Sequence, residues 1–173
     1  MPAVDVRSLH RDDDLASFRS GHKDLDRFLV KYAARNHFDL RLARTYVAIA
    51  DARVGGYVTL TGGALRGVEL PGDDVLGFPG YPLPVVVLAR LAVSADLQRG
   101  GVGQQLMRFT FETAIDQSER IGCIGVAVDS KADAVGYYER FGFKRFDRTG
   151  PRSDIVPMFL GLRTIQSAMT PEP

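Results

Sequence analysis

The sequence predicts an α/β fold, a mixed and mostly antiparallel twisted sheet of about six to seven strands with helices on both faces. Three observations lead to this prediction. Strand-like runs fill much of the first half, a strand–loop–helix–strand order occupies the second half, and 45% of the residues are hydrophobic. A chain of 173 residues is long enough for one domain with its own core. We therefore expect a single domain over residues 1–165 and a flexible tail at residues 166–173.

Two helices and two strands are expected in the first half. Acidic residues open a short helix at 12–18. Apolar residues recur every three or four positions at 22–37, which predicts an amphipathic helix. Runs rich in β-branched residues at 44–50 and 55–61 predict strands. The Gly- and Pro-rich stretch at 67–82 predicts an irregular loop, of a length that is usually functional or mobile.

The second half is expected to hold the centre of the sheet. The apolar run at 85–93 predicts a long central strand, which leads into a helix ending near residue 117. A near-continuous apolar run at 121–128 predicts a strand covered on both faces. A short helix at 132–140 and closing strands at 144–147 and 155–162 complete the fold.

The most informative segment is a glycine-rich loop between the central strand and the following helix. Its spacing matches neither Gly-x-Gly-x-x-Gly nor Gly-x-x-x-x-Gly-Lys-Ser/Thr, so it is not a common nucleotide loop. Backbone N–H groups at a helix start, with the positive end of the helix dipole behind them, form an anion site suited to a pyrophosphate. The loop reads Gln98-Arg99-Gly100-Gly101-Val102-Gly103.

Composition excludes several classes of site. Cys123 is the one cysteine, which excludes an internal disulfide, and its apolar neighbours predict a buried thiol. His10, His22 and His37 lie in polar segments, where we expect them to be exposed, and show no metal-ligand spacing. We therefore expect no metal. No apolar run reaches 18 residues and the N-terminus has no signal pattern, so we expect a soluble, cytoplasmic protein with no membrane partner.

Basic residues follow one side of the helix at 22–37. The formal net charge is only +1, but this ridge indicates a polyanionic substrate. A solvated helix face gives the same pattern and remains an alternative. The ridge residues recur at every fourth position: Arg19, Lys23, Arg27, Lys31 and Arg35.

The glycine loop and a second motif together resemble the GNAT acetyltransferase superfamily. The second motif is Tyr137-Tyr138-Glu139-Arg140-Phe141-Gly142-Phe143, an aromatic pair and Glu before a Gly-Phe turn. A narrower resemblance, to GNAT-type toxins of toxin–antitoxin pairs, covers most of the chain. It rests on segments 18–21, 25–29, 43–47, 81–93 and 157–160.

The resemblance implies a GNAT fold whose splayed central strands bind acetyl-CoA. Backbone groups near the end of the central strand would hold the pantetheine, and the loop would hold the pyrophosphate. Tyr138 matches the tyrosine that protonates the departing thiolate, whereas Tyr137, about 100° round the helix, is expected to pack in the core. The implied cofactor-binding residues are Leu91, Ala92, Val93, Gln98, Arg99, Gly100, Gly101, Val102, Gly103 and Gln104.

The central strand also informs the choice of acceptor amine. Arg90 is its one ionisable residue, so the strand offers no carboxylate base. A lysine amine, with a pKa of about 10.4, is almost wholly protonated at neutral pH and benefits from such a base, whereas an α-amine at about 7.7–8.0 is already neutral in substantial part. Aminoacyl-tRNA carries an α-amine on a polyanion, and it is also the substrate that the toxin resemblance implies. The expected tRNA contacts are Lys23, Arg27, Lys31, Arg35 and Arg90.

The toxin resemblance further implies a ribbon-helix-helix-type antitoxin as partner and a homodimer. Two alternatives stay open: a GNAT enzyme acting on a small-molecule amine or a protein N-terminus, and a CoA-binding module without catalysis. Two positions depart from the family pattern. Ser20 stands where the family often has Cys. The loop reads Gln-Arg-Gly-Gly where Gln-Gly-Arg-Gly is commoner, so its basic side chain is shifted by one position, to Arg99. Neither is expected to abolish CoA binding, because backbone groups make the contacts.

Overall fold

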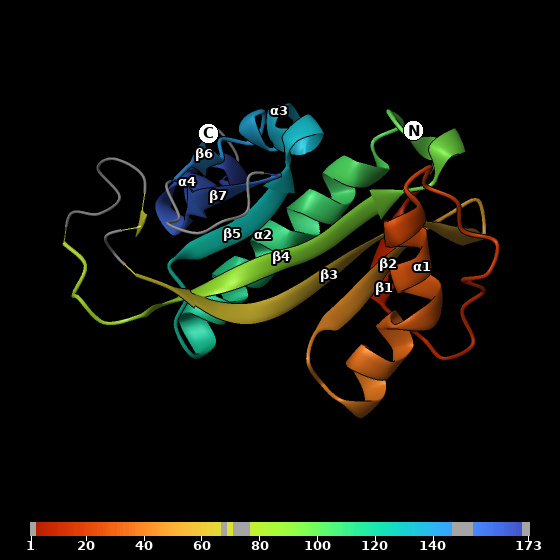
Figure 1. The fold of residues 1–173 in the computed structure, drawn as a ribbon, viewed down its shortest axis with the longest axis horizontal. Helices are drawn as coiled ribbons and strands as arrows, with labels where there is room; N and C mark the ends of the chain where they lie inside the picture. Colours follow the sequence, from red (N-terminus) through yellow and green to blue (C-terminus); the bar gives the residue numbers. More distant parts are fainter. Residues whose placement is uncertain (1–2, 67–68, 71–76, 147–153, 171–173) are drawn as a thin grey trace. The chain divides into compact units, whose positions relative to one another are not determined.

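The computed structural model describes residues 3–66, 69–70, 77–146 and 154–170 (Figure 1). The strands are β1 (Asp5–Ser8), β2 (Arg44–Ala50), β3 (Arg53–Leu65), β4 (Leu83–Val93), β5 (Gly125–Lys131), β6 (Lys144–Arg145) and β7 (Ile155–Gly161). The helices are α1 (Lys23–Lys31), α2 (Val102–Arg120), α3 (Val135–Glu139) and α4 (Leu162–Met169). Shorter turns are the π-helical η1 (Arg35–Asp39) and the 3₁₀ turns η4 (Ala95–Leu97) and η5 (Ala132–Ala134).

Within the described residues, seven strands form one sheet in the order β1-β2-β3-β4-β5-β7-β6. The pairs β1–β2, β2–β3, β5–β7 and β6–β7 are antiparallel. The predicted α/β fold with a mostly antiparallel sheet is confirmed. The chain forms two compact units: Met1–Thr61 with Leu88–Thr110, and Gly62–Val87 with Phe111–Pro173.

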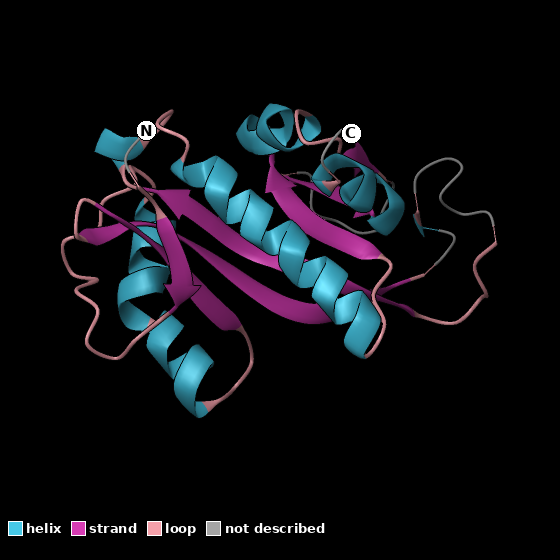
Figure 2. Cartoon of the chain, turned by 180° about the vertical axis from the view of Figure 1, so that it is seen from behind, coloured by secondary structure: helices cyan, strands magenta, loops and turns pink. Residues whose placement is uncertain are grey.

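In the first unit, two neighbouring residues of β3 show why helices cover both faces of the sheet. Successive side chains of a strand point to opposite faces. Tyr57 points toward α1, where its ring stacks on Phe28 with centroids 6.3 Å apart. Gly56 faces the start of α2, where an added Cβ would lie 3.0 Å from Val102 Cγ1 and 3.1 Å from Leu106 Cδ1. Figure 1 shows α1 in front of β1 and β2. Figure 2, which views the chain from the opposite side, shows the start of α2 in front of the sheet.

The second unit has its own core beside β5 and β7. The residue Ile165 of α4 is 1% exposed, and the N–H of Leu162 donates to Ile124 O at 2.9 Å, so α4 is part of this unit. The tail was expected to start at residue 166, but helix α4 runs to Met169. The buried members of the core are Leu65, Leu70, Leu83, Val85, Ala127, Phe146 and Phe159.

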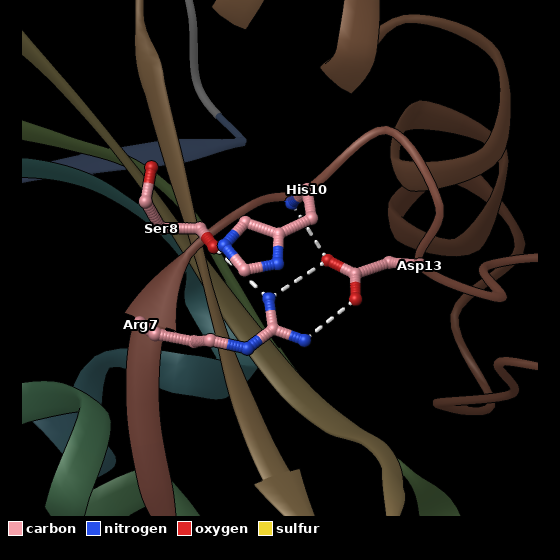
Figure 3. A network of polar contacts seen from close by, with 4 residues as sticks. All are labelled: Arg7, Ser8, His10 and Asp13. Atoms are coloured by element: carbon pink, nitrogen blue, oxygen red, sulfur yellow. Dashed lines mark hydrogen bonds and ion pairs between the residues drawn. The ribbon is translucent and has the colours of Figure 1, made fainter.

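The helix expected at 12–18 is wrong, because acidic side chains there bind nearby backbone. The Asp13 carboxylate accepts two hydrogen bonds from the Arg7 guanidinium, at 2.7 and 3.0 Å, and one from the His10 N–H at 2.8 Å (Figure 3). The Asp14 carboxylate accepts from the Ala16 N–H at 3.1 Å. Such side-chain bonds offer the backbone an alternative to helical ones, and the segment forms turns.

The strand expected at 121–128 begins four residues later than predicted. Helix α2 continues to Arg120, and Gly122 after it has a left-handed φ of +100°, a conformation that commonly ends helices. The N–H groups of Ile121 and Gly122 both donate to Gln117 O at 3.0 Å. Ile121 is consequently 79% exposed instead of lying in a buried strand.

The remaining elements follow the predictions with shifted ends. The strand at 44–50 matches β2, and the helix at 22–37 corresponds to α1 followed by η1. The helix expected at 132–140 is a 3₁₀ turn followed by the short α3. The sequence predicts neither strand β1 nor helix α4. Of the loop at 67–82, residues 67–68 and 71–76 lie outside the described residues, as does residue 147 of the strand expected at 144–147.

His37 is buried, at 1% exposure, and the prediction that it is exposed is wrong. Its neighbours in sequence are polar, but the π-helical turn η1 directs its ring toward β2. The ring Nδ1 accepts a hydrogen bond from the Thr45 N–H at 2.9 Å, and Nε2 lies 3.3 Å from Ser8 Oγ. His10 and His22 are exposed, as expected.

Candidate functional site

The loop between β4 and α2 is anchored by one side chain. The Gln98 amide donates to the carbonyl oxygens of Ser20 at 2.9 Å and Val93 at 3.1 Å. Within the loop, the Gly100 N–H donates to Leu97 O at 3.2 Å. Gln98 is among the predicted cofactor residues, but its side chain holds the loop to the end of β4. Its backbone is therefore the part available to a ligand.

Helix α2 begins with a set of backbone donors that point out of its first turn. Gly101 has a φ of +89°, a left-handed conformation that favours glycine. The first helical hydrogen bond runs from the Gln105 N–H to Gly101 O at 3.1 Å. The N–H groups before it have no acceptor within the helix, and the helix dipole adds positive potential there. They belong to Val102, Gly103 and Gln104.

Close packing fixes the direction of these donors. An added Cβ at Gly56 would lie 3.0 Å from Ala92 O, as well as against α2, so this glycine lets the helix start sit directly on β3 and β4. Val102 is fully buried. Of the predicted pantetheine-binding residues at the end of β4, Ala92 is buried, whereas Leu91 and Val93 are partly exposed.

Arg99 occupies a backbone position that normally suits glycine. Its φ is +63°, and its side chain is exposed. A left-handed conformation costs a non-glycine residue roughly 1–2 kcal/mol. The Arg-Gly order, in place of the commoner Gly-Arg, therefore puts strain at this position and puts an exposed arginine directly before Gly100 and Gly101.

The loop fits a pyrophosphate such as that of acetyl-CoA. It combines backbone donors, the positive end of α2, an exposed Gly100 and the Arg99 guanidinium in one stretch of chain. These are the features that an extended anion needs, and all of them lie in the first unit.

The segment around Ser20 supports the loop through hydrogen bonds that the sequence does not predict. Buried Ser20, whose carbonyl accepts from Gln98, donates its own hydroxyl to Asp26 Oδ1 at 2.5 Å. The Ala95 N–H also donates to Arg19 O at 2.8 Å. The only sequence signal for this support was the position of Ser20 in the toxin-like pattern.

Tyr137 and Tyr138 lie on α3 in the second unit, where they pack differently. Tyr138 is 7% exposed, and its ring packs edge-on against Phe143 with centroids 5.5 Å apart. Tyr137 packs edge-on against Phe141 at 5.2 Å, and its buried hydroxyl has no hydrogen-bond partner among the described residues. Burial raises the pKa of Tyr138 above its usual value and that of Tyr137 to about 12. Both phenols therefore keep their protons at neutral pH.

The predicted basic ridge is exposed in the first unit. Lys23, Arg27 and Lys31 lie on α1, and Arg35 lies in η1. Arg90 of β4 is exposed too, and its guanidinium carbon lies 4.2 Å from the centroid of the Phe28 ring. Arg19, by contrast, donates to the carbonyl oxygens of Ala16 and Phe18, each at 2.7 Å.

In the part of the chain that the structure describes, no group of His, Cys, Asp or Glu is placed to hold a metal ion. The Cys123 thiol is buried and donates to Gly125 O at 3.2 Å, as expected for a structural cysteine. None of the described helices has both the length and the apolarity needed to span a bilayer.

Comparison with known proteins identifies the family. The acetyltransferase (GNAT) domain family matches residues 41–145. A tRNA-acetylating toxin of Mycobacterium tuberculosis (strain ATCC 25618 / H37Rv) is 33% identical over 139 residues, covering 80% of this chain and 82% of the toxin.

Solved structures match nearly the whole chain. AtaT complexed with acetyl-methionyl-tRNAfMet aligns with a TM-score of 0.86 and 25% identity, covering 97% of this chain and all of AtaT. AtaTR bound with AcCoA aligns with a TM-score of 0.80 and 25% identity, covering 96% of this chain and 98% of that one. Together with the family match over more than half of its length, these findings show that the chain belongs to the GNAT acetyltransferases.

Proposed function

We propose that this protein is a toxin that transfers the acetyl group of acetyl-CoA to the α-amino group of an aminoacyl-tRNA. Acetylation removes the nucleophilic amine and so blocks its use in translation. The loop before α2, with left-handed Gly101 and three outward N–H groups, is the observation that carries acetyl-CoA binding. The 33% identity to a tRNA-acetylating toxin supports the choice of acceptor.

The reaction is acyl transfer to a neutral amine. The amine nitrogen attacks the thioester carbonyl, a C–N bond forms and the C–S bond breaks. The nitrogen releases one proton to water and the CoA sulfur takes up one, so protons balance over the reaction. Strand β4 supplies no carboxylate base, since Arg90 is its one ionisable side chain. An α-amine attached to an ester needs none, because a large fraction of it is neutral near pH 7.5. A lysine side chain would be a poor acceptor.

In this proposal Tyr138 gives the proton to the departing sulfur. Burial keeps its phenol protonated, so the donor form is present throughout the neutral range. Backbone groups of Leu91, Ala92 and Val93 bind the pantetheine arm. The loop from Gln98 to Gln104 binds the pyrophosphate, with the N–H groups of Val102, Gly103 and Gln104 as donors.

The basic ridge, Lys23, Arg27, Lys31 and Arg35, together with Arg90, contacts tRNA phosphates. Such contacts supply affinity through release of counterions and carry little sequence information. A ribbon-helix-helix-type antitoxin covers the site in the resting cell, and the toxin is a cytoplasmic homodimer. Expression without the antitoxin should therefore arrest growth.

The test is acetyl transfer from labelled acetyl-CoA to a pool of charged tRNAs. We expect label in the aminoacyl fraction, released by mild base with the acetylated amino acid, and none on deacylated tRNA. The Tyr138→Phe variant controls for contaminating activity. Label on peptide N-termini or small amines, with none on charged tRNA, would contradict the proposal in favour of another GNAT activity.

A further inference from the structure

Two aromatic rings of the first unit lie between two arginines that come from α1 and β4; one ring, that of Tyr32, belongs to the C-cap of α1. The Arg27 guanidinium carbon lies 6.0 Å from the Tyr32 ring centroid, and its Nη2 donates to the Tyr32 hydroxyl at 3.3 Å. The Tyr32 and Phe28 centroids are 6.5 Å apart. Arg90 then lies over Phe28. We call this set, Arg27, Tyr32, Phe28 and Arg90, the aromatic–arginine strip.

The two rings of the strip differ in exposure. Phe28 is 8% exposed and belongs to the core with Tyr57, so its packing is explained by the fold. Tyr32 is 43% exposed although Phe28 and the Arg27 guanidinium hold its ring in place. A half-exposed aromatic ring that packs on its neighbours presents its remaining flat surface to solvent. Core packing does not account for its exposed half.

The charges around Tyr32 favour an anionic partner. Lys31 and Arg27 are exposed beside it on α1, and Arg35 follows within one turn. The acidic residues of α1 lie in its first turn, and Asp26 there is bound by the Ser20 N–H and hydroxyl. A ring among guanidinium and ammonium groups is the combination that binds single-stranded nucleic acid, with bases on the ring and phosphates on the cations.

We infer that Tyr32 is a stacking platform for an unpaired base near the charged end of the tRNA, with Arg27 and Arg90 holding the flanking phosphates. This inference rests on the proposed function and deepens it. Paired bases in an RNA helix offer no free face, whereas unpaired bases stack on aromatic side chains. The ridge would then bind the phosphates of the helical part, and the strip would bind the unpaired end.

Tyr32→Ala is the decisive variant, because stacking and charge respond differently to salt. Loss of one stacked base should raise the dissociation constant for tRNA by about 5- to 150-fold. The slope of log affinity against log salt should stay unchanged, because no charge is removed. Tyr32→Phe, which keeps the ring and loses only the Arg27 hydrogen bond, should bind nearly as the wild type does.

Two matched controls separate the base contact from other effects. Leu42→Ala removes an exposed apolar side chain, 62% exposed, from the same unit and should leave tRNA binding unchanged. A tRNA lacking its unpaired 3′ nucleotides should bind wild type and Tyr32→Ala equally. Binding is measured on uncharged tRNA, so the result does not depend on which acceptor is acetylated.

The inference is overturned if Tyr32→Ala binds intact tRNA as tightly as wild type does, or if truncation of the 3′ end leaves the difference intact. A change in the molecular mass of the Tyr32→Ala protein in solution, with unchanged tRNA binding, would assign the ring to a protein interface and overturn it as well. Absence of acetyl transfer by the wild type, with these binding differences present, would instead refute the proposed function alone.

Discussion

The Nδ1 atom of His37 accepts a hydrogen bond from the backbone N–H of Thr45 at 2.9 Å. An imidazole that accepts through Nδ1 carries its proton on Nε2, and that nitrogen lies 3.3 Å from Ser8 Oγ. Burial, followed by the nearby Arg44 guanidinium, lowers the pKa of His37. The neutral ring thus joins η1 to both β1 and β2.

This relationship predicts a loss of stability in mild acid. An unfolded histidine binds a proton near pH 6.5, whereas folded His37 resists it, so the unfolded state gains protons first as pH falls. The free energy of unfolding should therefore fall by up to about 1.4 kcal/mol per pH unit below 6.5, until the lowered folded pKa is reached. Denaturant unfolding at a series of pH values measures this slope.

His37→Asn is the control, because its side-chain oxygen can accept from the Thr45 N–H without titrating. The variant should lose part of the slope between pH 6.5 and 5.5. An identical slope in both proteins would show that other groups cause the acid sensitivity.

The elements predicted correctly from sequence are those that local pattern determines. The alternating run of β2 and the glycine-rich start of α2 carry their own signals. Strand β1 has no such signal and exists through pairing with β2, in the register Asp5↔Ile49 to Ser8↔Tyr46. The turn at 12–18 depends on the Arg7–Asp13 pair, which joins separate segments. Long-range contacts of these kinds leave no periodicity in the sequence.

The same division applies to the candidate site. The loop residues were recognisable because glycine and helix-start patterns are local. The Gln98–Ser20 hydrogen bond joins residues 78 positions apart, and no local pattern indicates it. Likewise, Arg90 stacks on Phe28 because α1 packs against β4. The charge pattern of α1 alone does not predict this contact.

Gly101→Val should weaken CoA binding at least about tenfold, which corresponds to about 1.4 kcal/mol. A side chain at φ +89° is strained, and in the proposed function it would stand where the pyrophosphate approaches the backbone. Calorimetric titration with CoA measures the effect.

Gly122→Val is the matched control for backbone strain. Gly122 has a similar φ of +100°, and an added Cβ there meets no atom within 4 Å. Both variants should lose comparable stability, but only Gly101→Val should lose CoA affinity. Equal CoA affinity in the two variants would show that this loop does not bind the pyrophosphate.

Tyr138→Phe should lower kcat by about 10²–10⁴-fold, the usual contribution of general acid–base assistance, with the KM for acetyl-CoA little changed. Because burial raises the pKa of Tyr138, its acid form persists at high pH. The wild-type rate should therefore rise with pH as the substrate amine loses its proton, then stay level to about pH 10. Initial rates over this range, corrected for base hydrolysis of the aminoacyl ester in a parallel sample without enzyme, measure both effects.

Tyr137→Phe is the neighbouring control and should behave in the opposite way. It removes a buried hydroxyl without a partner among the described residues, so the free energy of unfolding should rise by about 1 kcal/mol and turnover should stay unchanged. A large loss of turnover in Tyr137→Phe, with normal turnover in Tyr138→Phe, would reverse the assignment of the two tyrosines.

Reversing two ridge charges, Arg27→Glu with Lys31→Glu, should raise the KM for charged tRNA and flatten its dependence on salt. Each lost phosphate contact reduces the slope of log affinity against log salt by about 0.9, so the double variant should lose nearly 2. CoA binding should be unchanged, because the loop before α2 is a separate element.

The control is Lys144→Glu with Arg163→Glu, which alters the net charge equally at exposed positions of the second unit. If both double variants raise the KM alike, the effect comes from total charge. If the ridge variant acetylates charged tRNA as the wild type does at two salt concentrations, the ridge is only a solvated helix face.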